Sequence, residues 1–143
     1  MGFNKENIIK CFADSGVIID NTAAERLALY GDYLVSENEK MNLTAICEEN
    51  EVTVKHFLDC ALLLQKVDIP KGARVADVGT GAGFPGVVLK ILRPDIELYL
   101  LDSLNKRIDF ILMTSQLKAQ GIVGKILVTG CLSQRYQQQI MEE

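Results

Sequence analysis

The chain has 143 residues, of which 48% are hydrophobic and 24% charged, values ordinary for one soluble globular domain. No run of about eighteen apolar residues occurs, and residues 1–6 lack the apolar core of a secretory signal, so we expect no membrane span and a cytoplasmic location. The net charge of −4 argues against an overall basic surface for nucleic acid, so any such contact must come from a local patch or from parts outside this chain.

The first 66 residues predict helices. A short apolar stripe opens the chain, and Thr22 to Glu25 form a capping-box pattern in which the threonine hydroxyl accepts from the Glu25 N–H. Behind this pattern, apolar residues recur at helical spacing, and a second periodic stretch runs from Val54 to Gln65. The stripes consist of Ile8, Ile9 and Phe12, then Leu27, Tyr30 and Leu34. We therefore predict a helical N-terminal cap over residues 1–72.

The pattern changes after the turn at residues 68–72. Short apolar strands are predicted at 74–78 and 96–101, with a third at 125–129, and helices are predicted at 87–92, 103 to about 119 and near the C-terminus. Strands that alternate with helices indicate an α/β fold with a parallel sheet and right-handed connections. We predict an incomplete Rossmann-like domain over residues 73–143, with about three parallel strands.

A glycine-rich turn follows the first strand. Glycines at positions 79, 81, 83 and 86 allow positive φ and a close approach of the backbone to a ligand. The turn leads from the carboxyl end of a strand into a helix, where open α/β sheets bind their ligands. Asp102 lies nineteen residues beyond Gly83 at the end of the second strand, the expected place for a carboxylate that binds ribose hydroxyls. The sequence therefore predicts a nucleotide site.

Asp77 distinguishes between two kinds of nucleotide. Residues 81–86 satisfy GxGxxG, so a dinucleotide and an NAD-dependent oxidoreductase fragment are one alternative. An acid two residues before Gly79 would repel a pyrophosphate. S-adenosyl-L-methionine has no phosphate and carries an ammonium and a sulfonium, so the Asp77 carboxylate favours it. The motif from Val75 to Gly83 is typical of the first motif of a methyltransferase.

Four blocks in this order resemble the bacterial small-subunit (16S) ribosomal RNA guanine-N7 methyltransferases, formerly glucose-inhibited division protein B. They are Met41–Ile46, His56–Asp59, Asp77–Gly86 and Leu101–Arg107, and the resemblance extends to about Phe110. It implies methyl transfer from S-adenosyl-L-methionine to N7 of a guanine in 16S rRNA. Guanine N7 has a free lone pair, so the transfer needs no general base, and alignment of the reacting groups can supply most of the effect.

The resemblance also implies site residues. Gly79 and Phe84 would touch the cofactor together with Gly81 and Gly83, and Asp102 with Ser103 would lie near the ribose. Asn42 and His56 would lie near the mouth of the substrate site. Two interpretations of His56 remain open: it hydrogen-bonds a guanine edge or a phosphate, or it is a helix residue packed between Val52 and Cys60.

The part of the chain from about residue 111 resembles another group, most clearly at residues 125–136. This group is the N-terminal domain of radical methylthiotransferases, in which the cysteine of the TGC run binds an iron–sulfur cluster. Only Cys131 would be carried over, and Cys11, Cys47 and Cys60 have unrelated spacing, so we expect reduced thiols and no metal. We interpret the chain as a hybrid of two gene segments.

Because the family's sheet has seven strands, we expect a truncated methyltransferase with low or no turnover. A non-catalytic nucleotide-binding remnant is the alternative, and an uncovered sheet edge would favour a homodimer. The expected RNA partner is 16S rRNA or the small ribosomal subunit.

Overall fold

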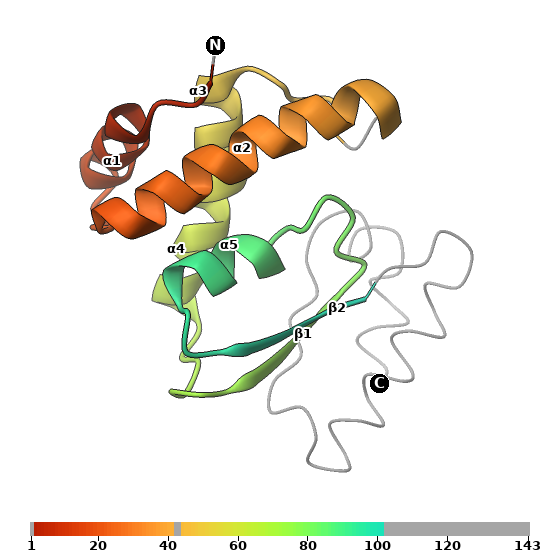
Figure 1. Ribbon diagram of the computed structural model, residues 1–143. Helices are drawn as coiled ribbons and strands as arrows, with labels where there is room; N and C mark the ends of the chain where they lie inside the picture. Colours follow the sequence, from red (N-terminus) through yellow and green to blue (C-terminus); the bar gives the residue numbers. More distant parts are fainter. Residues whose placement is uncertain (1, 42–43, 102–143) are drawn as a thin grey trace. The chain divides into compact units, whose positions relative to one another are not determined.

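The computed structural model describes residues 2–41 and 44–101 (Figure 1). These residues belong to two compact units. The first unit comprises the chain up to Ile69 together with Ile91–Pro94. The described part of the second covers Pro70–Lys90 and residues 95–101. The predicted helix after residue 103, the third strand at 125–129 and the last helix lie outside the described residues.

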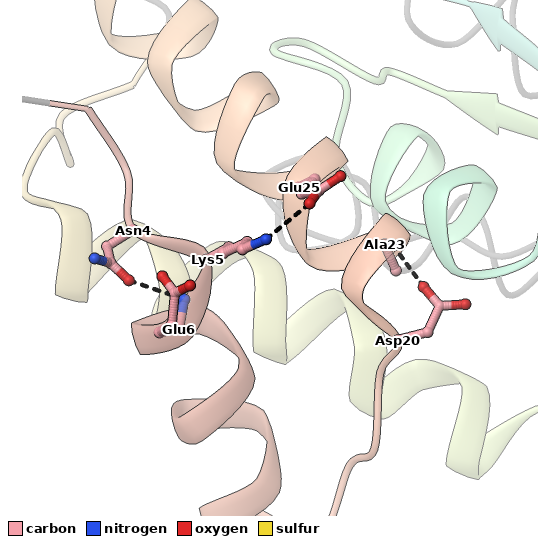
Figure 2. Close-up of polar contacts among 6 residues, drawn as sticks. All are labelled: Asn4, Lys5, Glu6, Asp20, Ala23 and Glu25. Carbon is pink, nitrogen blue, oxygen red and sulfur yellow. Dashed lines mark hydrogen bonds and ion pairs between the residues drawn. The ribbon is translucent and has the colours of Figure 1, made fainter.

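The first unit consists of helices, as predicted for residues 1–66. They are α1 (Lys5–Asp14), α2 (Asn21–Met41), α3 (Glu49–Val52), a π-helical stretch η1 (Thr53–Leu58) and α4 (Asp59–Lys66). Asn4 caps α1, because its side-chain oxygen accepts from the Glu6 backbone N–H at 2.8 Å (Figure 2) and from the Asn7 backbone N–H at 3.1 Å. The apolar pattern of the sequence thus gave the right element type throughout this unit.

The start of α2 differs from the prediction. Asp20 rather than Thr22 caps the helix, with its carboxylate accepting from the Ala23 N–H at 2.7 Å (Figure 2). The helix begins at Asn21, so Thr22 already lies inside its first turn. Glu25 does not reach back to a cap, because its carboxylate pairs with the Lys5 ammonium on α1 at 2.8 Å. The capping box was therefore wrong, and an acid two residues earlier satisfies the orphan N–H instead.

The predicted apolar stripes form the core of the first unit. Ile8 and Phe12 of α1 and Leu27 and Leu34 of α2 are almost fully buried. Phe57 is also buried, and its ring lies 5.7 Å from that of Tyr30 in a stacked arrangement and 6.1 Å from that of Phe3. Aromatic pairs at these distances add to the stabilisation that burial gives, so η1 is held to α2 and to the N-terminal segment around Phe57.

The second unit contains a parallel sheet, as predicted. Strand β1 (Arg74–Val78) pairs with β2 (Glu97–Leu101) in a register that joins Arg74 to Glu97 and Val78 to Leu101. The glycine-rich turn connects β1 to α5 (Gly86–Leu92), and the two strands lie side by side (Figure 1). The fold class of the described part is therefore α/β with two parallel strands.

The turn that precedes β1 is also as expected. The Ala73 N–H donates to the Pro70 carbonyl at 3.1 Å, and Gly72 has a φ of 71°, which suits glycine at the third position of such a turn. The Gly72 N–H donates to the Asp95 carboxylate at 2.9 Å. Within residues 2–41 and 44–101, no helix has both the length and the apolar character needed to cross a membrane.

Candidate functional site

The glycine-rich turn after β1, residues 79–85, is called the glycine loop below, and it is hydrogen-bonded to the end of the sheet. The N–H groups of Gly79 and Thr80 donate to the Leu101 carbonyl at 2.7 and 3.2 Å, which continues the β1–β2 pairing into the loop. The chain then turns back, and the Thr80 carbonyl accepts from the N–H groups of Gly83 and Phe84 at 2.9 and 3.1 Å. The glycines at 79, 81 and 83 have φ values of 76°, 56° and 104°, which other residues rarely adopt.

Asp77 lies at the base of this loop, one residue before the end of β1. It is only 6% exposed, and its Oδ2 accepts from the Gly86 N–H at 2.9 Å. This bond joins the end of the strand to the first residue of α5. A Cβ on Gly86 would lie 2.7 Å from Asp77 Oδ2 and 2.7 Å from Leu100 Cδ2. Gly86 is therefore required by the close packing of the helix start against the strand.

Thr80 is a residue of the loop that sequence analysis did not assign to the site. Its side chain is buried to about nine-tenths, with 9% of the residue exposed. Its hydroxyl oxygen has no hydrogen-bond partner among the residues that the structure describes. A buried polar atom without a partner costs about 1–3 kcal/mol, so this hydroxyl is a candidate contact for a ligand. Its position inside the glycine motif was the available sequence signal.

His56 lies in the first unit, in the π-helical stretch η1. Its Nε2 is 3.1 Å from Thr44 Oγ1, and the same hydroxyl accepts from the Ile46 N–H at 3.1 Å. Burial lowers the pKa of His56 below its ordinary 6.5, and the nearby Asp59 carboxylate opposes this effect more weakly. The neutral form of the ring therefore predominates at pH 7. A single π turn within an α-helix is frequent at functional sites.

Asn38 connects α2 to the same segment. It is buried, with 9% of the residue exposed, and its Oδ1 accepts from the Thr44 N–H at 2.7 Å. Its Nδ2 donates to the Cys47 sulfur at 3.0 Å. Sequence analysis missed both Asn38 and Thr44 as site residues. Thr44 belongs to the block Met41–Ile46 that carried the resemblance, whereas Asn38 had no signal beyond a polar residue on a helix.

The predicted site residues thus fall into three groups. Asp77 of β1 belongs to the second unit, as do the loop residues Gly79, Gly81, Gly83 and Phe84. His56 belongs to the first unit with Asn38 and Thr44, and each unit is described on its own. Asn42, Asp102 and Ser103 lie outside the described residues, as does Cys131. Within the described residues, Cys11, Cys47 and Cys60 form no disulfide.

Comparison with known proteins points to the same family as the sequence motifs do. Residues 23–123 match the family model described as rRNA small subunit methyltransferase G. Proteins named ribosomal RNA small subunit methyltransferase G are similar to this chain: one from Alkaliphilus metalliredigens is 52% identical over 101 residues, which are 71% of this chain and 42% of that protein. The one from Desulfitobacterium hafniense is 55% identical over 87 residues, which are 61% of this chain and 35% of its own length.

A third relative, from Clostridium perfringens, is 46% identical over 106 residues, which are 73% of this chain and 44% of that protein. The chain therefore spans about two fifths of the length of these curated relatives. The family match ends at residue 123, so it overlaps the start of the segment from about residue 111 that resembles radical methylthiotransferases. That second resemblance stays a prediction.

Proposed function

This chain belongs to the rRNA small subunit methyltransferase G family, and on that premise we propose that it carries the cofactor-binding part of an enzyme that methylates a guanine of 16S rRNA at N7. The proposed methyl donor is S-adenosyl-L-methionine. The observation that carries the proposal is the buried Asp77 carboxylate at the base of a glycine loop, at the carboxyl end of a parallel strand. Ligands of open α/β sheets bind at this edge.

The contacts of Asp77 favour the methyl donor over a dinucleotide. The Gly86 N–H, at the start of α5, donates to the Asp77 carboxylate at 2.9 Å. In a dinucleotide site such a helix-start N–H would face the pyrophosphate. An anion already held at this position repels phosphate and attracts an ammonium or sulfonium. The donor groups of S-adenosyl-L-methionine therefore suit this loop better than those of NAD.

The residues of the loop fit this cofactor in a second respect. The buried Thr80 hydroxyl lacks a partner among the described residues, and a bound ligand with a polar group would supply one. We assign Asp77, Gly79, Gly81, Gly83 and Phe84 to the cofactor site, with Asp102 and Ser103 as further proposed contacts. When bound, the cofactor supplies an activated methyl group. The loop's contribution is to bind and orient it.

The neutral state of His56 bears on its proposed role with the substrate. We assign His56 and Asn42 to the guanine site. An uncharged imidazole gives no electrostatic attraction to a phosphate, but it can donate or accept one hydrogen bond at each ring nitrogen. Guanine presents two acceptors, N7 and O6, on one edge. A donor to O6 leaves the N7 lone pair available for methyl transfer, so we propose that His56 contacts the base edge and not the RNA backbone.

Calorimetric titration tests the cofactor assignment. We expect the purified chain to bind S-adenosyl-L-methionine and to give no heat of binding with NAD at the same concentration. Binding of NAD alone would support an oxidoreductase fragment and overturn the proposal. A folded chain that binds neither compound would correspond to a non-catalytic remnant. If the methyl donor binds, methylation of 16S rRNA or of small ribosomal subunits is the next assay.

Thr80→Val tests whether the buried hydroxyl contacts the cofactor. Valine has nearly the same shape, so it removes an unpaired polar atom without opening a cavity. We expect the thermal stability of the free chain to be unchanged or higher, and the affinity for S-adenosyl-L-methionine to fall about 2- to 12-fold, the value of one neutral hydrogen bond. Thr80→Ser keeps the hydroxyl and should bind as the wild type does. Equal affinity of the valine variant and the wild type would show that this hydroxyl makes no ligand contact.

A further inference from the structure

A chain of polar contacts runs from Asn38 of α2 through Thr44 to His56 of η1. The buried Asn38 amide accepts from the Thr44 N–H at 2.7 Å and donates to the Cys47 sulfur at 3.0 Å. Both of its polar atoms are thus used to hold the segment that carries Thr44. The Thr44 hydroxyl in turn lies 3.1 Å from His56 Nε2. Asn38 and His56 come from different helical elements, so Thr44 is hydrogen-bonded to both α2 and η1.

The direction of the last hydrogen bond follows from the hydroxyl's other contact. A threonine hydroxyl has one proton to donate and two lone pairs to accept with. Thr44 Oγ1 already accepts from the Ile46 N–H at 3.1 Å, and His56 Nε2 is its other contact in the described part of the chain. If Nε2 carried a proton, the hydroxyl would accept twice and its own proton would have no protein acceptor there. Donation from Thr44 to Nε2 satisfies both the hydroxyl proton and the Nε2 lone pair.

We propose that Asn38 and Thr44 are positioning residues that hold the His56 ring with Nε2 as acceptor and the proton on Nδ1. This inference rests on the proposed function for its purpose, since His56 is the residue assigned to the guanine edge. In this tautomer the donor of the ring is the Nδ1–H group, and a hydrogen bond to guanine O6 needs a donor. Asn38 acts indirectly, because it holds Thr44 in position. Thr44 acts directly, because its hydroxyl orients the His56 ring and determines which ring nitrogen carries the proton.

Nitrogen-15 NMR of the wild-type chain gives the first test, and it needs neither cofactor nor RNA. His56 is the single histidine of the sequence, so the ring signals are unambiguous. In free histidine the neutral ring prefers its proton on Nε2. We expect the opposite here above pH 7: an unprotonated Nε2 and a protonated Nδ1. A dominant Nε2–H tautomer in the folded wild-type chain would overturn the proposal, whatever the outcome of the cofactor titration.

Thr44→Val and Thr44→Ser form the matched pair of variants. A hydrogen bond donated to Nε2 stabilises the neutral ring, so its loss in the valine variant should raise the pKa of His56 by roughly half to one pH unit and shift the proton toward Nε2. The serine variant keeps the hydroxyl and should retain the wild-type tautomer. The Asp59 carboxylate acts on the charge of the ring, and neither change touches it.

Asn38→Ala separates positioning from direct contact. The Asn38 side chain bonds Thr44 and Cys47 and not the His56 ring. Only an indirect effect through Thr44 therefore predicts that its truncation changes the His56 tautomer in the same direction as Thr44→Val. Backbone amide spectra show whether each variant is folded. If Thr44→Val and Thr44→Ser shift the pKa equally, or if folded Asn38→Ala leaves the tautomer unchanged, the positioning role is wrong.

Discussion

Replacing Asp77 by asparagine is expected to weaken the binding of S-adenosyl-L-methionine by about 10- to 150-fold while the chain stays folded. The asparagine oxygen can still accept from the Gly86 N–H, which holds the present contact at 2.9 Å. The substitution removes the negative charge and turns an acceptor into an NH₂ donor. A hydrogen bond to a charged group contributes about 1.5–3 kcal/mol, which corresponds to the predicted loss.

Titration calorimetry of the wild type and the variant measures this effect, with circular dichroism as a check of folding. Asp95→Asn is the matched control. Asp95 is an exposed acid of the same unit whose carboxylate also accepts from a backbone N–H, that of Gly72, at 2.9 Å. It lies outside the glycine loop, so its loss should leave the affinity unchanged. Unchanged affinity in folded Asp77→Asn, or the same loss in both variants, would contradict the assignment of Asp77 to the cofactor.

Gly86→Ala is expected to lower the free energy of unfolding of the second unit by about 1–3 kcal/mol, the usual cost of forcing one extra methyl group into a packed site. The new Cβ would lie 2.7 Å from Asp77 Oδ2 and 2.7 Å from Leu100 Cδ2. Leu100 is 45% exposed and can rotate away. Asp77 is buried and short, so its carboxylate must move or the start of α5 must shift. Cofactor affinity should fall together with stability, because Asp77 bonds the start of α5 and is also the residue proposed to bind the cofactor.

Urea unfolding followed by circular dichroism measures the stability change, and calorimetry measures the binding. Gly72→Ala separates the steric clash from the cost of backbone conformation. Gly72 has a φ of 71° with no atom within 4 Å of an added Cβ, so alanine there is penalised by conformation alone, about 1–2 kcal/mol, and should bind normally. If the Gly86→Ala variant binds S-adenosyl-L-methionine as tightly as the wild type does, the packing around Asp77 is not needed for the site.

The elements of the fold could be predicted where the chain gives a strong local signal. β1 was predicted at the residues where it is found, Arg74–Val78, because an apolar run is bounded by a turn and by glycines. The second strand begins at Glu97, one residue later than predicted. The cap of α2 was placed wrongly because Asp20 and Thr22 are both good capping residues two positions apart, and local preferences do not choose between them.

The candidate site could be predicted only in part. The glycine motif and Asp77 were assigned to the site from the sequence because a ligand loop requires residues of special conformation and charge in a fixed order. The proposed roles of Thr80 and Asn38 depend on burial, which follows from packing between elements distant in sequence. The contact of Thr44 with His56 joins residues twelve positions apart through a non-helical connection, and no periodic pattern indicates it. The sequence predicted that Gly86 lets the backbone approach a ligand. In the structure, glycine is required there because a side chain would clash with Asp77 and Leu100.

The π-helical stretch has a consequence for how the length of this segment can vary. In η1 the Asp59 N–H donates to the carbonyl of Val54, five residues earlier, so this turn accommodates one more residue than an α-helical turn does. A one-residue deletion between Thr53 and Leu58 would allow an uninterrupted α-helix, with both flanking helices still in phase with the core. It would also rotate the local side chains by about 100° per residue and present another one to Thr44. A deletion here therefore changes which side chain faces Thr44 without breaking the helix.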